Sequence, residues 1–193
     1  MPGFGPRSID GGLDRVPLPA GQPGALWLCG KHVVGPDPDK ALARADDASA
    51  VVCLNHRYEI EGRYPRYVAW LEANAGGRAL WWPVHDLHAP PMEDMRRWVD
   101  ELVARLGRGE GVVIHCGAGM GRAPTLAACV LIALGSTAEE AVAHVAAHRP
   151  MAGPESGAQE ELVAQFPVEA SIGTSTGPAD EPDGQPPQRT DQG

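Results

Sequence analysis

Four short apolar runs lie along the middle of the chain, and each is bounded by glycine, proline or polar residues. Their positions are 25–30 (ALWLCG), 50–55 (AVVCLN), 79–84 (ALWWPV) and 111–116 (GVVIHC). Runs of this length are too short for helices, and such boundaries are typical of buried strands. The pattern therefore predicts four strands.

Stretches with helical periodicity alternate with these runs and then follow them. The first three lie at 64–73, 93–106 and 123–134. Thr137 and Glu140 form a T-x-x-E capping box ahead of AVAHVAAH, which Arg149 and Pro150 end, and GAQEELVAQF at 157–166 has its own periodicity. This order predicts an α/β fold with a central, mostly parallel sheet of four to five strands flanked by helices. Binding sites in such sheets form at the carboxyl ends of the strands.

The two ends of the chain lack this alternation. Residues 1–24 are rich in glycine and proline and predict a flexible leader. Residues 168–193 have no aromatic side chain and an excess of acidic ones, which predicts a disordered acidic tail. The segment between them, 25–167, is long enough for one catalytic domain with a sizeable core.

The net charge narrows the classes of partner. With 16 Lys and Arg against 25 Asp and Glu, the formal net charge is −9. This acidity argues against a nucleic-acid partner and against an anionic membrane surface. No apolar run approaches the roughly 20 residues of a membrane span, and the start of the chain lacks the order of a signal peptide. We therefore expect a cytoplasmic protein in which any anion site is local.

The cysteines are scattered, at Cys29, Cys53, Cys116 and Cys129. They show no CxxC spacing and no dense framework, which predicts reduced thiols. Three histidines, His85, His88 and His115, accompany them, but no four ligands have the spacing of a zinc site. We therefore expect no metal.

The segment HCGAGMGRAPT (115–125) follows the last apolar run and combines a cysteine, alternating glycines and an arginine. Glycine allows positive φ and close approach of backbone N–H groups to a ligand, and a helix that begins near Ala123 directs its positive end at the same place. These surroundings favour the thiolate form of Cys116. Arg122 adds a planar fork that suits two phosphate oxygens.

Two other interpretations of this segment are weaker. A strand could end in a turn of small residues, with Cys116 as a packing residue, but this would not explain the spacing to Arg122. A nucleotide-binding P-loop needs a lysine followed by serine or threonine, and neither is present.

At these residues the chain resembles the cysteine-dependent protein tyrosine phosphatase superfamily, whose signature is H-C-x5-R. His115, Cys116 and Arg122 match the signature. The chain length and the downstream HRPMAGPESGAQEEL resemble the dual-specificity branch, and in element order the resemblance covers roughly 25–166. It implies a protein phosphatase that acts on phosphotyrosine, with phosphoserine and phosphothreonine as further candidates.

The resemblance also implies a role for each residue of the signature. Cys116 would attack phosphorus to give a phosphocysteine, Arg122 would stabilise the transition state, and His115 would orient the loop by hydrogen bonding. The phosphoryl oxygens would be held by Gly117, Ala118, Gly119, Met120, Gly121 and Arg122. The expected partner is a phosphorylated protein, and no cofactor is implied.

The mechanism also needs a general acid, which the family takes from an aspartate on an upstream loop. Asp86, in WWPVHDLHAPP, follows a predicted strand and is our candidate. Asp94 is the alternative acid, but its place in a helical stripe favours a first-turn charge. His85 and His88 flank Asp86 and could tune or substitute for it, although loop histidines are common.

Further candidates rest on the same resemblance. Gln159 is similar to a glutamine that places water in some relatives, but a surface glutamine on a helix is the simpler interpretation. Cys53 ends a neighbouring strand and could form a disulfide with Cys116, although packing is the commoner role of such a cysteine. Three arginines could line the pocket or be solvated, namely Arg57, Arg63 and Arg66.

One position departs from the family. Relatives usually have serine or threonine directly after the arginine, where the hydroxyl assists the leaving cysteine, and here Ala123 occupies it. Thr125 does not obviously replace it, because two helical residues turn the side chain by roughly 200°. We expect slower hydrolysis of the phosphocysteine. The alternatives are therefore a phosphoprotein-binding module with little turnover, or a phosphatase of a non-protein ester such as a phosphoinositide.

Overall fold

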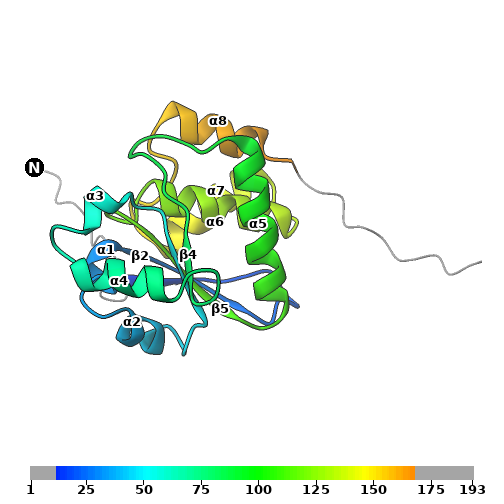
Figure 1. The fold of residues 1–193 in the computed structure, drawn as a ribbon. Coiled ribbons are helices and arrows are strands. Elements are labelled where there is room, and N and C mark those ends of the chain that lie inside the picture. The colour runs from blue at the N-terminus through cyan, green and yellow to red at the C-terminus, as the bar shows by residue number, and fades with distance from the viewer. Residues whose placement is uncertain (1–11, 168–193) are drawn as a thin grey trace, which may run out of the picture.

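A five-stranded sheet runs through the computed structural model, which describes residues 12–167 (Figure 1). The strands are β1 (Leu13–Val16), β2 (Ala25–Gly30), β3 (Ala50–Cys53), β4 (Ala79–Trp81) and β5 (Gly111–Cys116), in the spatial order β1-β2-β5-β3-β4. Strands β2 to β5 are parallel and β1 is antiparallel to β2. The four strands predicted from the apolar runs are confirmed, as is the mostly parallel α/β architecture.

Strand β1 corrects the prediction of a flexible leader over residues 1–24. Leu13 pairs with Cys29 and Val16 with Leu26, and the side chains of Leu13 and Val16 are buried. Burial of these two side chains against the edge of the sheet explains why this short segment is ordered. Residues 1–11 and the predicted acidic tail, 168–193, lie outside the described residues.

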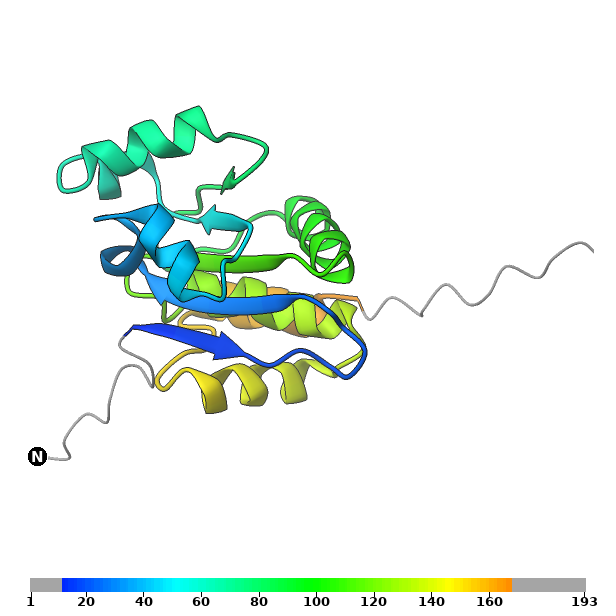
Figure 2. The same cartoon turned by 90° about the horizontal axis from the view of Figure 1, so that it is seen from below.

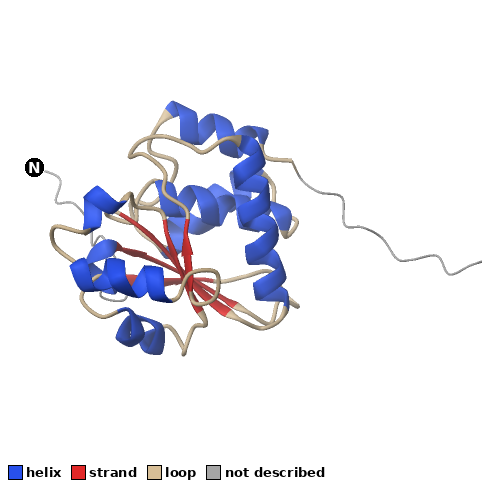
Figure 3. Ribbon diagram, viewed as in Figure 1, coloured by secondary structure: helices blue, strands red, loops and turns tan. Residues whose placement is uncertain are grey.

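Helices cover both faces of the sheet (Figures 2 and 3). The five predicted helices are confirmed with small shifts in their ends, as α4 (Pro65–Ala73), α5 (Met92–Gly107), α6 (Arg122–Ala133), α7 (Ala138–His148) and α8 (Gly157–Gln165). The predicted capping box at Thr137 is present, because its hydroxyl accepts from Glu140 N and the Glu140 carboxylate accepts from Thr137 N. Three short helices were not predicted, namely α1 (Lys31–Val34), α2 (Pro38–Arg44) and α3 (Arg57–Ile60).

The sheet separates two hydrophobic cores. On one face, Leu26, Leu28, Val112 and Ile114 pack with helices α5 to α8, and on the other face residues such as Val113 pack with α1 to α4. This alternation along β5 follows from the two-residue period of a strand. Strand β5 is thus covered on both sides, so its carboxyl end is held firmly.

Helix α6 is buried from Arg122 to Ile132. A helix that is apolar all round belongs in a core, and α6 lies against β5 with α5, α7 and α8 around it. In the described part of the chain, no helix has both the length and the apolar character needed to cross a bilayer.

Candidate active site

The loop from Cys116 to Arg122 connects the carboxyl end of β5 to the first turn of α6, as the sequence predicted. We call residues 116–122 the phosphate loop. Of its three glycines only Gly119 has positive φ, at 76°. Gly119 and Gly121 are also required for space, because a Cβ at these positions would collide with Cys29 O and with the Glu155 carboxylate. The glycines therefore serve close packing as much as backbone freedom.

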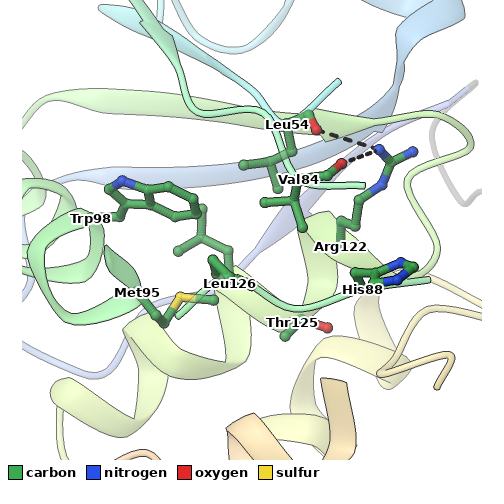
Figure 4. A pocket seen from close by; sticks show the side chains of 9 residues that line it. Leu54, Val84, His88, Met95, Trp98, Arg122, Thr125 and Leu126 are labelled. Carbon is green, nitrogen blue, oxygen red and sulfur yellow. Dashed lines mark hydrogen bonds between the residues drawn. The ribbon is translucent and has the colours of Figure 1, made fainter. Parts of the chain in front are cut away.

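Arg122 is held in place by several hydrogen bonds. Its Nη1 donates to Val84 O at 2.7 Å and to Leu54 O at 3.4 Å (Figure 4). Its guanidinium also forms two parallel hydrogen bonds with Glu59, of 3.0 and 2.9 Å. By contrast, Arg122 Nε is buried without a hydrogen-bond partner. One edge of the guanidinium is therefore fixed by the protein, and a buried donor is left over.

Glu59 of α3 was not singled out in the sequence. Its carboxylate accepts from Arg122, from His56 N at 2.8 Å and from Asn55 Nδ2 at 2.8 Å. Burial acts to raise the pKa of Glu59, but the hydrogen bonds from Arg122 and His56 outweigh it, so the pKa lies below its ordinary value. Glu59 is thus a fixed anion that positions the arginine.

Asp86 lies at the same edge of the sheet, as predicted. It follows β4, and its Oδ1 is 3.1 Å from Arg122 Nη2, with 69% of its side chain exposed. The competing candidate, Asp94, lies in the first turn of α5 and pairs with Arg97 at 2.6 Å. Asp94 therefore has the expected role of a first-turn charge, and Asp86 is the aspartate that faces the phosphate loop.

The segment around Asp86 is anchored by the chain before and within α8. Ser156 Oγ donates to Leu87 O at 2.7 Å, and Gln159 Nε2 donates to His88 O at 3.2 Å. Gln159 is buried, so its interpretation as a surface glutamine is wrong. Its side chain is buried because it fills the space between α6, α8 and the segment around Asp86.

The histidines near Asp86 form part of an aromatic row. The rings of His56 and His85 stack at 4.1 Å between centroids, and Tyr58 Oη lies 3.4 Å from His85 Nδ1. His88 Nδ1 hydrogen-bonds Asp86 O at 2.7 Å. The His85 ring is thus stacked on His56, and neither it nor His88 hydrogen-bonds the Asp86 carboxylate.

His115 is fully buried beneath the phosphate loop. The hydroxyl of Tyr67 donates to its Nε2 at 2.6 Å, and its Nδ1 lies 3.4 Å from Cys116 O. Burial lowers the pKa of His115 to about 3, so the ring is neutral. His115 is therefore satisfied within the core and is also a neighbour of Cys116, which is compatible with the orienting role that the resemblance implies.

Arg149, which the sequence predicts as the end of a helix, lies directly under the phosphate loop. Its guanidinium donates to Gly119 O at 2.5 Å and to Ala118 O at 3.0 Å. It also pairs with Asp14 of β1 at 2.6 Å. Because Arg149 binds these two carbonyl oxygens on the outside of the loop, the backbone amide groups of the loop are free to face an anion.

All four cysteines are free thiols. Burial raises the pKa of Cys53 to about 12 and raises that of Cys29 further. In register, Cys53 pairs with His115, so its side chain lies on the face of the sheet opposite to that of Cys116. A disulfide between Cys53 and Cys116 stays a prediction that requires a local rearrangement.

The three arginines considered for the pocket are engaged elsewhere or solvated. Arg57 pairs with Glu72 and lies over the Trp81 ring, and Arg63 lies over the Tyr64 ring. Arg66 is exposed on α4. None of them is part of the hydrogen-bond network around the phosphate loop.

A small apolar cavity of about 10 Å³ lies beside Arg122, and its lining includes Leu54, Val84, Met95 and Trp98 (Figure 4). It has room for one water molecule at most. The Trp98 ring also stacks on Trp82, with 5.3 Å between the centroids and 3° between the planes. The wall of the site behind Arg122 is therefore tightly packed.

Within residues 12–167, no group of three or more His, Cys, Asp or Glu is placed to hold a metal.

A family model described as "Swiss Army Knife protein, DSP-PTPase phosphatase domain" matches residues 28–168. The chain belongs to this phosphatase-domain family. Protein tyrosine phosphatase type IVA 2 of Mus musculus is 39% identical over 69 residues, which are 35% of this chain and 41% of the relative. The chain thus spans about two fifths of the length of the curated relatives that it matches.

Two solved structures show how widely the architecture is shared. Tk-PTP in its active form is 26% identical, with a TM-score of 0.58 over 74% of this chain and 89% of that one. PTPMT1 in complex with PI(5)P is 22% identical, with a TM-score of 0.59 over 73% of this chain and 88% of that one. The family predicted from the signature is confirmed, and the second likeness concerns the fold alone.

Proposed function

We propose that the chain is a cysteine-dependent phosphatase that hydrolyses phosphotyrosine in proteins, with phosphoserine and phosphothreonine as further substrates. The observation that carries this proposal is the unpartnered, buried Nε of Arg122, a donor that neither Glu59 nor the carbonyl groups engage. Buried donors are almost always satisfied in native proteins. A phosphoryl oxygen would supply the partner, with Cys116 at the start of the same loop.

In the first step, the Cys116 thiolate attacks phosphorus. An S–P bond forms, the bond from phosphorus to the tyrosyl oxygen breaks, and the Asp86 carboxyl gives its proton to that oxygen. The amides of the phosphate loop and Arg122 hold the three phosphoryl oxygens, where negative charge is concentrated in the transition state. Glu59, His115 and Arg149 position these groups.

In the second step, water attacks the phosphocysteine. The Asp86 carboxylate accepts a proton from the water, an O–P bond forms, and the S–P bond breaks to return the Cys116 thiolate and release inorganic phosphate. Ala123 offers no hydroxyl to the departing sulfur. Thr125 does not replace it, because its hydroxyl donates to Gly121 O at 2.9 Å.

Ala123 favours a second candidate function, a phosphoprotein-binding module with little turnover. Its side chain is wholly buried in an apolar cluster, so this position supplies no polar group to the site. Binding of the phosphoryl group needs only the loop and Arg122. The two functions thus differ in the rate of the second step.

Release of p-nitrophenol from p-nitrophenyl phosphate tests the proposal. Wild type should release it, and Cys116→Ser should not. Absence of release that depends on Cys116, together with retention of a phosphotyrosine peptide by Cys116→Ser, would support the binding module instead. Asp86→Ala should slow a phosphopeptide more than p-nitrophenyl phosphate, because the peptide has the poorer leaving group.

Two finer points are part of the same proposal. A panel of phosphopeptides and phosphoinositides with the purified protein separates protein substrates from non-protein esters. A cytoplasmic location is expected from the sequence, and cell fractionation would check it.

A further inference from the structure

Within residues 12–167, three large apolar side chains are markedly exposed. They are Tyr58, Leu87 and Met151, with 65%, 55% and 43% of their surfaces accessible. They come from three segments that are distant in sequence: α3, the segment between β4 and α5, and the segment between α7 and α8. Single exposed apolar residues are common, but each of these three is close in the chain to residues that contact one place.

That place is the phosphate loop and the surface around it. Tyr58 directly precedes Glu59, which binds Arg122, and Leu87 directly follows Asp86, which pairs with Arg122 at 3.1 Å. Consecutive Cα atoms lie about 3.8 Å apart, so the backbone of each residue lies next to a residue that contacts Arg122.

Met151 is connected to the loop through the residues on either side of it in the chain. It lies two residues after Arg149, which donates to Gly119 O, and two before Gly153, whose N donates to Met120 O at 2.9 Å. We call Tyr58, Leu87 and Met151 the apolar rim.

Two members of the apolar rim also have an unfavourable backbone. Leu87 has φ of 60° and Met151 has φ of 65°, in the left-handed region that favours glycine and asparagine. Each position thus combines a strained backbone with an exposed apolar side chain, and strain of this kind gathers at binding sites. Leu87 is held in place by the hydrogen bond from Ser156 Oγ to its carbonyl oxygen.

We propose that the apolar rim binds the residues on either side of the phosphorylated residue, and that the preferred substrate is a protein segment with apolar side chains next to its phosphotyrosine. This inference rests on the proposed function, which supplies the phosphate at the centre. Each contact would bury part of an exposed apolar side chain on both partners.

The charges near the rim favour a protein segment over a membrane. The chain has a net charge of −9, and Asp86 and Glu155 both lie at the phosphate loop. The cytoplasmic leaflet of a cell membrane is anionic, so it repels a molecule with this negative charge. A segment of protein chain that is uncharged next to its phosphotyrosine is not repelled in this way, and it can pack against the three apolar side chains.

The test compares two phosphotyrosine peptides of equal length and charge, one with leucine and one with glycine on each side of the phosphotyrosine. Wild type should show a kcat/KM about tenfold higher for the leucine peptide. The triple variant Tyr58→Ser, Leu87→Asn, Met151→Asn should bring this ratio to within about twofold of one. Asparagine tolerates the left-handed backbone, so the variant keeps the loops in place.

Conservative substitutions serve as matched controls. Tyr58→Phe and Leu87→Met retain the apolar surface and should keep the ratio of wild type. The ratio of kcat/KM for the two peptides is taken within each variant, so a change in the chemical steps that is common to both peptides cancels. Thermal unfolding of every variant confirms that it is folded.

Three outcomes separate the ideas. A ratio near one in wild type, with both peptides hydrolysed, overturns the apolar rim and leaves the proposed function intact. If no phosphoester is hydrolysed, the same ratio is measured as Kd on Cys116→Ser, so the rim is judged even when the proposed function fails. The proposal is also overturned if the peptide ratio is near one while the triple variant cleaves phosphatidylinositol phosphate in phosphatidylcholine vesicles about tenfold more slowly than wild type.

Discussion

Asp14 and Arg149 form an ion pair in the interior, with 2.6 Å between Asp14 Oδ2 and Arg149 Nη1 and side-chain exposures of 1% and 2%. The remaining donors of Arg149 hold the carbonyl oxygens of Ala118 and Gly119. A residue of the first strand is therefore connected through one side chain to the phosphate loop, more than a hundred positions later in the sequence.

Asp14→Asn should lower the free energy of unfolding by about 3–5 kcal/mol, because it leaves the Arg149 charge buried without its counter-ion. Urea denaturation measures this change. Asp46→Asn is the matched control, since Asp46 pairs with Arg15 at 3.6 Å on the surface and should cost less than about 1 kcal/mol. Equal effects of the two substitutions would show that the buried pair has no special importance.

Glu59→Gln should reduce kcat/KM for p-nitrophenyl phosphate by roughly tenfold to a hundredfold, because a neutral amide cannot hold both Arg122 nitrogens and small misplacements are costly. Steady-state kinetics measure the change. Glu61→Gln alters an exposed carboxylate two positions further along the chain and should behave like wild type. If Glu59→Gln also behaves like wild type, Arg122 is positioned by the carbonyl groups alone.

The buried His115 should make the protein less stable as the pH falls. Its folded pKa of about 3 lies below the ordinary value near 6.5, so between these values the unfolded state binds the extra proton. The contribution is fully present above about pH 6.5 and declines below it by roughly 1.4 kcal/mol per pH unit. Unfolding free energies measured between about pH 6 and pH 4.5 should show a smaller slope for His115→Asn than for wild type.

His32→Asn is a useful comparison for this slope. Burial also lowers the pKa of His32, but the group is partly accessible, so water screens the effect and its removal should change the slope much less. A slope in His115→Asn equal to that of wild type would mean that His115 is protonated in the folded protein.

Ala123→Ser should accelerate the second chemical step by supplying the hydroxyl that most relatives have. In rapid-mixing experiments, the burst of p-nitrophenol should become smaller and the steady-state rate should rise about tenfold, if release of the thiolate limits turnover. The new hydroxyl enters a fully buried position and should cost about 1–2 kcal/mol of stability. An unchanged steady-state rate would place the slow step elsewhere.

The sequence predicted the parts of the structure whose signals are local. The apolar runs contain the strands β2 to β5, and the Cys116-to-Arg122 spacing identified the phosphate loop, because both depend on neighbouring residues. Asp86 was found for the same reason, since it directly follows a recognisable run. Strand β1 was missed because two charged residues interrupt its four positions, and one of them, Asp14, is buried against a distant arginine.

The residues that support the loop could not be found in this way. Glu59 lies in a charged stretch where nothing distinguishes it from Glu61, and it meets Arg122 across 63 positions. Arg149 looked like a helix end because its pairing partner lies in a segment expected to be loose. Pairing over such separations is decided by tertiary packing, which periodicity and local spacing do not report.

The stack of Trp82 on Trp98 provides a built-in optical reporter of the active site. Two indole rings that are nearly parallel and 5.3 Å apart couple their electronic transitions and contribute to the aromatic circular dichroism. Trp82 lies four residues before Asp86, on the same connecting segment, while Trp98 is fixed in α5. Vanadate or a phosphopeptide that shifts this segment will alter the coupling, so occupancy of the site can be followed in the unlabelled protein.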